Sequence, residues 1–330
     1  MRRDPFFDVL KFFAMLLVVL GHVYWAFGCK TWMPYFENFR CGMNMPLFFM
    51  IAGYFAARTI ENGDWRKLGK HIYGYFWPVA VVSVVFAALA VALHIPGSEK
   101  GFIGYAGRRF LFSPWFLWCL AYCFVLTFLC YRPKTLVLRG GAFLSLIIVL
   151  PFLTTGWHMN SARAMLPFFV FGAFVLRRWD FWKNWKIGVG CLSAYALGVL
   201  FQGDIIRNGL SFYVMPTTWV AFISDWKALP LYLARIANGV FGSVGIMWFL
   251  HASCRKFSVI TKLAPLGMTT LWVYILHQWL LDRVVGIGWH SASIWCVLMW
   301  TVLLFGFSHA CGTLVQYLVE RAAGWCTETR

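Results

Sequence analysis

The chain has 330 residues, of which 61% are hydrophobic, 20% aromatic and only 12% charged, and its formal net charge is +17. A soluble domain carries about twice that charged fraction, whereas apolar runs of about 17–25 residues, long enough to cross a bilayer, recur along this sequence. These features exclude an ordinary soluble protein, and the continuous rather than alternating apolar runs also argue against a membrane β-barrel.

The positive charge is not gathered into one basic patch. Lys and Arg residues stand in short clusters between the apolar runs, which is the distribution that cytoplasmic loops of membrane proteins show. We therefore expect membrane lipids, and no nucleic acid, among the partners. Most of the ten cysteines lie inside apolar runs, where cysteine behaves as a small apolar residue. A disulfide between Cys29 and Cys41 requires their loop to face an oxidising compartment.

Ten apolar segments are predicted to be membrane helices, so the expected fold class is an all-α polytopic membrane protein, a bundle of about ten transmembrane helices. The segments lie at about 6–27, 43–60, 72–94, 114–131, 140–157, 164–178, 185–201, 229–251, 266–285 and 292–318. The more polar stretch 204–228 is treated as a loop, although an eleventh span there is the alternative. Residues 1–330 are expected to form one membrane-embedded domain without a soluble domain.

The distribution of basic residues predicts an orientation for this bundle. With ten spans, eighteen of the 29 Lys and Arg residues lie on the side of the two termini, and ten lie on the opposite side. Cytoplasmic loops carry the excess of positive charge. We expect a multi-pass protein of the cytoplasmic (inner) membrane with both termini in the cytoplasm.

The first apolar segment contains three ionisable residues, Asp8, Lys11 and His22. A charged side chain near the bilayer centre costs about 2.5 kcal/mol or more, so each is a functional candidate. Lys11 and His22 are about three helical turns, or roughly 16 Å, apart on one face, and Asp8 lies one turn before Lys11 on the same side. Alternatively, Lys11 reaches the headgroups beside Asp8 and His22 caps the interface.

Five motifs carry a family resemblance. In chain order they are Asp8-Val9-Leu10-Lys11 with His22, Met45-Pro46-Leu47-Phe48-Phe49-Met50-Ile51-Ala52-Gly53-Tyr54-Phe55, Trp115-Phe116-Leu117, Leu166-Pro167-Phe168-Phe169-Val170-Phe171-Gly172, and Leu266-Gly267 through Tyr274-Ile275-Leu276-His277. This ordered set resembles the integral membrane acyltransferase family 3, in particular its fucose 4-O-acetylase-related, nodulation-type sugar O-acetyltransferases. The chain departs from the family pattern at Lys11, Ala52 and Asn44, where Arg, Ser and His are common.

The resemblance implies an enzyme that moves an acyl group, usually acetyl, from cytoplasmic acetyl-CoA to a sugar hydroxyl. The acceptor would be a cell-surface glycan or its lipid-linked precursor. In this interpretation Lys11 neutralises a CoA phosphate or orients the pantetheine arm. His22 acts as general base on the hydroxyl, or as a nucleophile through an acyl-histidine. His277 orients the acceptor or the oxyanion, or is simply hydrogen-bonded between helices.

Besides Asp8, five further residues are candidates for substrate binding, and four of these have a structural alternative. Arg66 and Lys70 suit the phosphates of CoA, or follow from the positive-inside rule alone. Asn44 suits a sugar hydroxyl, although helix capping is the favoured role. Trp115 suits stacking on a sugar, or belongs to the interfacial aromatic belt. Arg163 suits an anionic glycan or lipid phosphate, and Asp8 completes the set beside Lys11.

Two other functions use the same polar residues. A transporter or flippase of a glycan or lipid intermediate would need a path open to both sides and no CoA. An inactive relative would have a scaffolding role in glycan assembly. Motifs for a Gly-rich phosphate loop or a zinc site are not found in the sequence, so no metal is expected.

Overall fold

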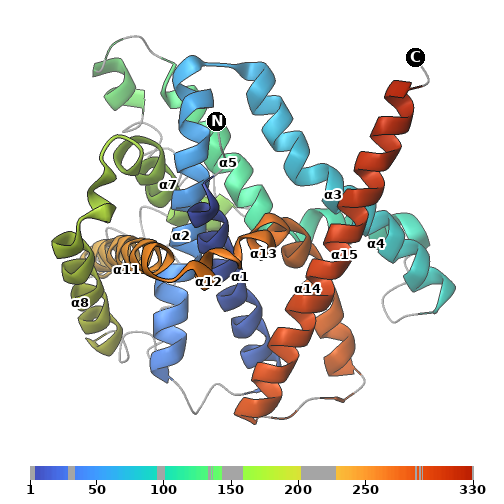
Figure 1. Ribbon diagram of the computed structural model, residues 1–330. Helices are drawn as coiled ribbons and strands as arrows, with labels where there is room; N and C mark the ends of the chain where they lie inside the picture. Colours follow the sequence, from blue (N-terminus) through green and yellow to red (C-terminus); the bar gives the residue numbers. More distant parts are fainter. Residues whose placement is uncertain are drawn as a thin grey trace. The chain divides into compact units, whose positions relative to one another are not determined.

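The computed structural model describes residues 4–28, 34–94, 101–132, 135, 137–142, 159–201, 228–286, 288–289, 291 and 293–328. The described residues are helical or lie in turns between helices, and none forms a strand. The main helices are α1 (Pro5–Ala26), α2 (Pro34–Asn62), α3 (Trp65–Ala92), α4 (Gly101–Phe112), α5 (Trp115–Cys130), α7 (Met159–Phe171), α8 (Trp185–Phe201), α11 (Ala228–Lys256), α12 (Ser258–Thr261), α13 (Ala264–Met268), α14 (Thr270–Gly286) and α15 (Ile294–Glu328) (Figure 1). The all-helical fold class is thus confirmed.

The predicted number of ten spans is not confirmed. Within the described residues, four helices are long and apolar enough to cross a membrane, and six if each of two bent pairs is one span. The four lie in α1, α3, α11 and α15. One bent pair is α4 with α5, at 54°, so helix α4 occupies a region predicted to lie between spans. The predicted span 140–157 and the loop 204–228 lie largely outside the described residues.

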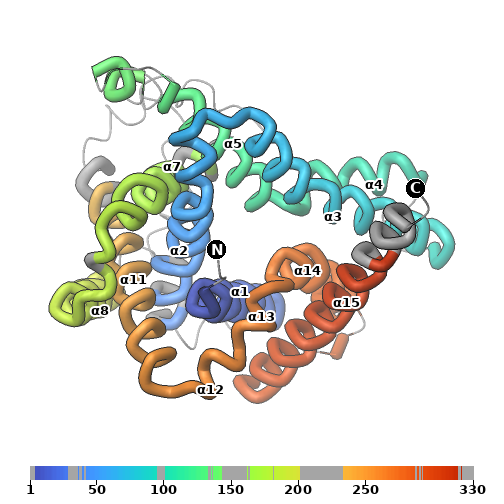
Figure 2. Tube along the Cα trace, turned by 45° about the horizontal axis from the view of Figure 1, so that its top comes forward, coloured from blue at the N-terminus to red at the C-terminus, as the bar shows by residue number. Residues whose placement is uncertain are grey.

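The chain divides into two compact units, of which the first comprises Met1–Arg40 and Met247–Arg330. Within it, α1 packs against α13, α14 and α15 (Figure 2). One such contact joins the rings of Phe12 and Phe305, 5.3 Å apart edge to face. The opposite side of α15 exposes Leu303, Phe307 and Leu314. Those residues recur at helical spacing, as expected of a helix with one lipid-facing side.

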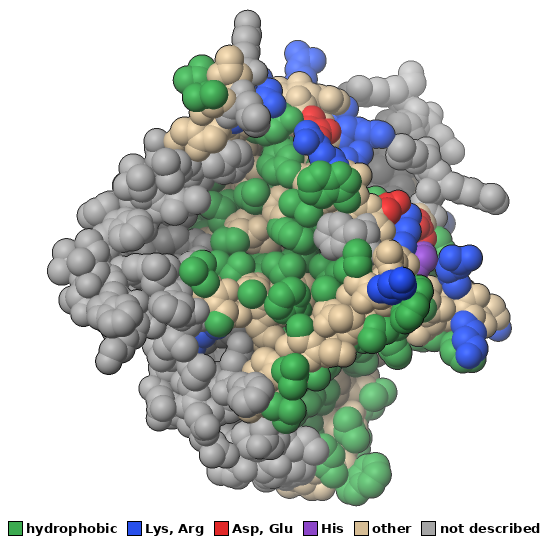
Figure 3. Space-filling model, turned by 90° about the vertical axis from the view of Figure 1, so that its left-hand side faces the viewer, with side chains coloured by type: hydrophobic (Ala, Val, Ile, Leu, Met, Phe, Trp, Pro, Cys, Tyr) green, Lys and Arg blue, Asp and Glu red, His purple; other side chains and the backbone are tan. Residues whose placement is uncertain are grey.

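Apolar side chains are also abundant on the molecular surface. Figure 3 shows broad areas of hydrophobic side chains on one face, with Lys and Arg side chains gathered toward the top and right of the view. Exposed apolar areas of this extent are uncommon in soluble monomers. Together with the long apolar helices, they identify a membrane protein.

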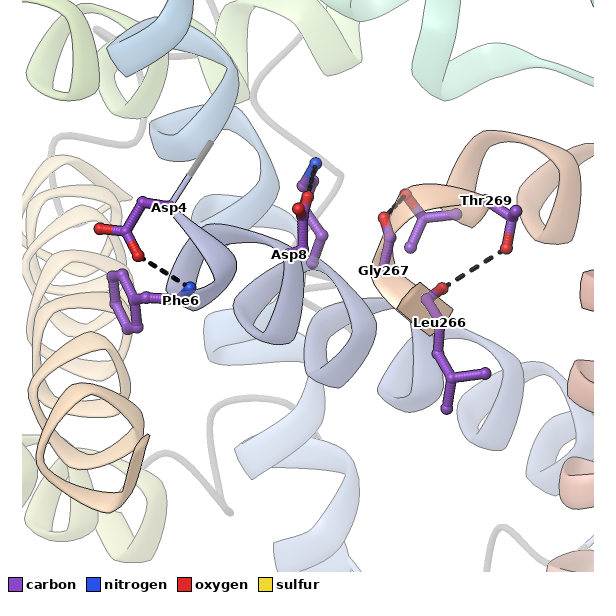
Figure 4. Close-up of polar contacts among 8 residues, drawn as sticks. Asp4, Phe6, Asp8, Leu266, Gly267 and Thr269 are labelled. Carbon is purple, nitrogen blue, oxygen red and sulfur yellow. Dashed lines mark hydrogen bonds and ion pairs between the residues drawn. The ribbon is translucent and has the colours of Figure 1, made fainter. Parts of the chain in front are cut away.

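The predicted span 266–285 is not one continuous helix. It is broken at Thr269, where Ser258–Met268 and Thr270–Gly286 meet at 68°. The Thr270 hydroxyl donates to the Gly267 carbonyl at 3.2 Å, and the Thr269 hydroxyl to the Leu266 carbonyl at 3.5 Å (Figure 4). Such side-chain bonds compete with helical backbone bonds, which explains a break that hydropathy does not reveal.

The second unit comprises Cys41–Ile246. The predicted spans 43–60 and 72–94 leave Arg66 and Lys70 in a loop between them. In the structure both residues lie in α3 instead, because only Gly63 and Asp64 separate α2 from α3. Gly63 adopts a positive φ of 62°, which glycine tolerates without strain. The Asp64 side chain caps α3 by accepting from the Lys67 backbone N–H at 3.0 Å, and this bond lowers the pKa of the Asp64 carboxyl.

Two glycines from different motifs bring α2 close to α7 and to the π-helical turn Gly172–Leu176 that follows it in the second unit. A Cβ added to Gly53 would overlap the backbone of Phe169, and one added to Gly172 would overlap the backbone of Met50. The two contacts pair residues in an antiparallel register, since 53 lies opposite 169 and 50 opposite 172. Small residues permit this close approach of membrane helices. These motif glycines therefore have a packing role.

Candidate active site

The N-terminal end of α1 forms the first part of the candidate site. Asp4 caps the helix by accepting from the Phe6 N–H at 3.0 Å, and Pro5 occupies the first turn, where its missing N–H is not needed (Figure 4). One turn later the Lys11 ammonium lies 2.6 Å from the Asp8 carboxylate, whose side chain is 5% exposed. The predicted neighbours Asp8 and Lys11 thus form an ion pair, with Lys11 partly exposed at 24%.

Helix α13 packs directly on this ion-paired turn. A Cβ on Gly267 would overlap the backbone carbonyl of Asp8, so only glycine allows the helices to approach so closely. Leu266-Gly267 is one of the five motifs found in the sequence. Its position explains why a motif near residue 267 accompanies one near residue 8: the two form a single helix contact.

At the other end of α1, two histidines meet. The Nδ1 atom of His22 lies 2.8 Å from Nε2 of His277, a residue of α14 that is fully buried. Their rings stack with centroids 5.0 Å apart and planes 10° from parallel. The Nδ1 atom of His277 lies 2.7 Å from the carbonyl oxygen of Val273. The structure therefore joins the two histidines that the sequence singled out.

This chain of hydrogen bonds defines the tautomer of each neutral ring. The Val273 carbonyl can only accept, so Nδ1 of His277 carries the hydrogen. Nε2 of His277 then has a lone pair and accepts from Nδ1–H of His22. The remaining nitrogen of His22, Nε2, is left with a lone pair. A nitrogen with an available lone pair is what a general base requires.

Arg40 is a charged neighbour of His22 that the sequence did not identify as a site residue. It lies on α2 and is only 7% exposed. A Cβ added to Gly21 would overlap the Cδ, Nε and Cζ atoms of Arg40, so the guanidinium lies against the residue before His22. Its charge interacts electrostatically with His22. In the sequence Arg40 precedes the predicted span 43–60 and contributes only to the charge of a loop.

Asn44 was expected to cap a helix that begins near residue 43, and this expectation is wrong. Helix α2 begins at Pro34, because proline suits a helix start and the polar residues after it continue the helix. Asn44 is consequently inside the helix and 1% exposed. Neither atom of its amide has a hydrogen-bond partner among the residues that the structure describes.

The other predicted substrate contacts lie in the second unit. Arg66 and Lys70 are exposed on the first two turns of α3. Trp115 is the first residue of α5, with its ring 6.3 Å from that of Phe116. Arg163 belongs to α7, but its side chain falls outside what the structure describes, as does the predicted Cys29–Cys41 pair. The described part of the chain shows no cluster of three His, Cys, Asp or Glu that could hold a metal.

Comparison with known proteins gives the chain its family. The family model described as acyltransferase domain, that of the acyltransferase 3 family, matches residues 4–317. Nodulation protein NolL of Sinorhizobium fredii (strain NBRC 101917 / NGR234) is 30% identical over 181 residues, which are 52% of this chain and 48% of NolL, so the chain spans about half the length of that curated relative. No solved structure matches the chain. Because the family model covers nearly the whole sequence, the chain belongs to the acyltransferase 3 family.

Proposed function

We propose that this membrane acyltransferase moves an acetyl group from cytoplasmic acetyl-CoA to a sugar hydroxyl of a cell-surface glycan or its lipid-linked precursor. The observation that carries the proposal is the hydrogen-bond chain from Val273 through His277 to His22, which leaves His22 Nε2 as a base. Similarity to a nodulation protein supports the glycan acceptor. Family membership favours this enzyme over a transporter or flippase.

In the proposed reaction, the acceptor hydroxyl oxygen bonds to the thioester carbonyl carbon and its proton passes to His22 Nε2. The carbonyl π electrons move to oxygen and form an oxyanion. Collapse of this intermediate restores the C=O bond and breaks the C–S bond. The CoA thiolate leaves and takes the proton from His22, so the base is regenerated.

Lys11 has a more specific role in this proposal than neutralising a phosphate. Its charge is already matched by Asp8 at 2.6 Å, so the pair presents little net charge to the polyanionic head of CoA. An ammonium group has three N–H donors, however, and those not used on Asp8 can bind the amide oxygens of the pantetheine arm. The exposed cations Arg66 and Lys70 on α3 then serve the phosphates.

The test is transfer of radiolabelled acetyl from acetyl-CoA into alkali-labile esters, with the protein in lipid nanodiscs or native membranes. We expect His22→Gln to lower transfer by about 100-fold or more, the usual contribution of a general base. His94→Asn is the matched control, because His94 is exposed at the end of α3 with a positive φ that asparagine tolerates. Unchanged transfer by His22→Gln would contradict the mechanism, and a wild type that binds no acetyl-CoA would contradict the donor.

A further inference from the structure

Arg40 is a buried cation that interacts electrostatically with His22, the residue proposed as base, and its position follows from how α2 begins. Within the first unit, the start of α2 runs antiparallel to the end of α1. Phe36 meets Tyr24, with ring centroids 5.6 Å apart, and one turn further along α2 the Arg40 side chain meets Gly21. Residues 36 and 40 share one face of α2, as do residues 21 and 24 on α1. The guanidinium is therefore placed by two helices.

Gly21 is the feature that lets the guanidinium come so close. All three heavy atoms nearest to a Cβ added at this position belong to the Arg40 side chain. Glycine inside a helix costs about 1 kcal/mol relative to alanine, and here it leaves the space that the guanidinium occupies. Because His22 is the next residue, the same space brings Arg40 close to His22.

The chemistry of an arginine at this position is well defined. A guanidinium is charged at every physiological pH and presents five N–H donors in a rigid plane. Donors held near a forming oxyanion, in surroundings from which water is excluded, are usually worth about 100- to 1,000-fold in rate. Arg40 is 7% exposed and interacts electrostatically with His22. It is thus buried, permanently charged and next to the base.

We infer that Arg40 is the oxyanion-stabilising residue of this enzyme: its N–H groups bind the thioester oxygen as the carbonyl carbon becomes tetrahedral beside His22. The inference rests on the proposed function and extends it to a residue of α2. Negative charge develops on that oxygen when the acceptor oxygen bonds to carbon, and returns to the C=O bond when the C–S bond breaks. Arg40 gains and loses no proton in either step.

The test compares Arg40→Gln and Arg40→Lys with wild type at saturating acetyl-CoA. We expect Arg40→Gln to lower acetyl transfer by about 100-fold while the Kd for radiolabelled acetyl-CoA changes less than about threefold, because an oxyanion is absent from the ground state. Arg40→Lys keeps the charge without the planar donors and should retain an intermediate rate. Normal transfer by folded Arg40→Gln, or a loss explained by weaker acetyl-CoA binding, would overturn the inference.

A second variant tests the same position without removing the charge. Gly21→Ala improves helix propensity but places a methyl group where the guanidinium lies, so we expect slower transfer at undiminished thermal stability. The same change made on top of Arg40→Ala should have no further effect, since the pair acts through one contact. Gly306→Ala on α15, where a Cβ meets nothing within 4 Å, is the control and should transfer normally. Additive effects of Gly21→Ala and Arg40→Ala would overturn the inference.

The outcomes also separate this inference from the proposed function. Release of CoA thiol with water as the only nucleophile needs the oxyanion but no sugar, so it should fall in Arg40→Gln as transfer does. If it stays at the wild-type rate while transfer falls, Arg40 binds the acceptor and the inference fails. If His22→Gln is inactive and Arg40→Gln is active, the inference fails and the proposed function stands. If both variants are active, the proposed role of His22 fails as well, whereas a wild type that transfers no acetyl overturns the proposed function.

Discussion

Nε2 of His277 accepts a hydrogen bond from Nδ1–H of His22, because Nδ1–H of His277 donates to the Val273 carbonyl. In the proposed mechanism His277 is therefore a positioning residue, because it holds the tautomer of His22 that has its lone pair on Nε2. A substitution that keeps an acceptor at this position should preserve part of the activity. One that removes the acceptor should not.

We accordingly expect His277→Gln, whose amide oxygen can accept from His22, to transfer acetyl about 10-fold faster than His277→Leu. The difference corresponds to about 1.4 kcal/mol, the size of a typical hydrogen bond. Initial rates of acetyl transfer at equal amounts of folded protein measure it. Equal rates for the two variants would show that His277 acts by packing alone.

The sequence singles out Asp8, Lys11 and His22 because ionisable groups are rare within apolar helices, and it singles out His277 through the family resemblance. The structure joins these four residues into two pairs. The motif glycines were identified by resemblance, whereas their physical role required coordinates. Position 267, for example, requires glycine because a Cβ there would overlap the backbone of Asp8, more than 250 residues earlier in the chain.

Two features could not be predicted from the pattern of residues. Hydropathy runs smoothly through Thr269, so the bend at that residue was missed; it depends on side-chain hydroxyls and on His309, whose Nδ1 lies 2.5 Å from the Thr269 hydroxyl. Arg40 was missed because it precedes the apolar part of α2. The helix begins at Pro34, and this earlier start is what turns an apparent loop cation into a buried neighbour of His22.

The contact between α2 and α7 should be sensitive to a single methyl group. Because a Cβ on Gly53 or Gly172 would overlap backbone atoms, which cannot move aside as a side chain can, each change to alanine should cost about 2 kcal/mol of stability. Thermal unfolding in detergent measures the loss. Gly190→Ala on α8, where a Cβ meets nothing within 4 Å, is the control and should be neutral or stabilising. A similar loss in all three variants would refute this packing role.

The Asp8–Lys11 pair allows stability and activity to be separated. Lys11→Met takes the cation from a nearly buried carboxylate, and because Lys11 is partly exposed we expect a loss of about 2 kcal/mol, below the value for a fully buried pair. Adding Asp8→Asn should restore thermal stability. It should not restore acetyl transfer if Lys11 binds the donor. Full activity of the stable double variant would show that Lys11 has only a structural role.

Replacing Asn44 by an apolar residue should raise stability and lower activity. Its buried amide has no hydrogen-bond partner among the described residues, and removing such a group typically gains about 1 kcal/mol or more. Asn44→Leu, which keeps the branched shape of the side chain, should therefore raise the melting temperature and lower acetyl transfer if the amide binds the acceptor. Thr127→Val is the control, since the Thr127 hydroxyl is buried and likewise without a partner in the described structure. It should stabilise the protein without changing transfer, and an active Asn44→Leu would exclude acceptor binding.

The exposed cations of α3 can be tested with a donor that lacks one phosphate. If Arg66 and Lys70 bind the 3′-phosphate of CoA, the double change to glutamine should raise the KM for acetyl-CoA about 10-fold and leave kcat unchanged, because charge-assisted contacts to the phosphate exist in both ground and transition states. With 3′-dephospho-acetyl-CoA, wild type and variant should have similar KM values. Lys183→Gln, which removes an exposed cation paired with Asp180, should change neither constant. If the ratio of the variant's KM to the wild-type KM is the same for both donors, the lost interaction does not involve the 3′-phosphate. Arg66 and Lys70 would then lie outside the 3′-phosphate site.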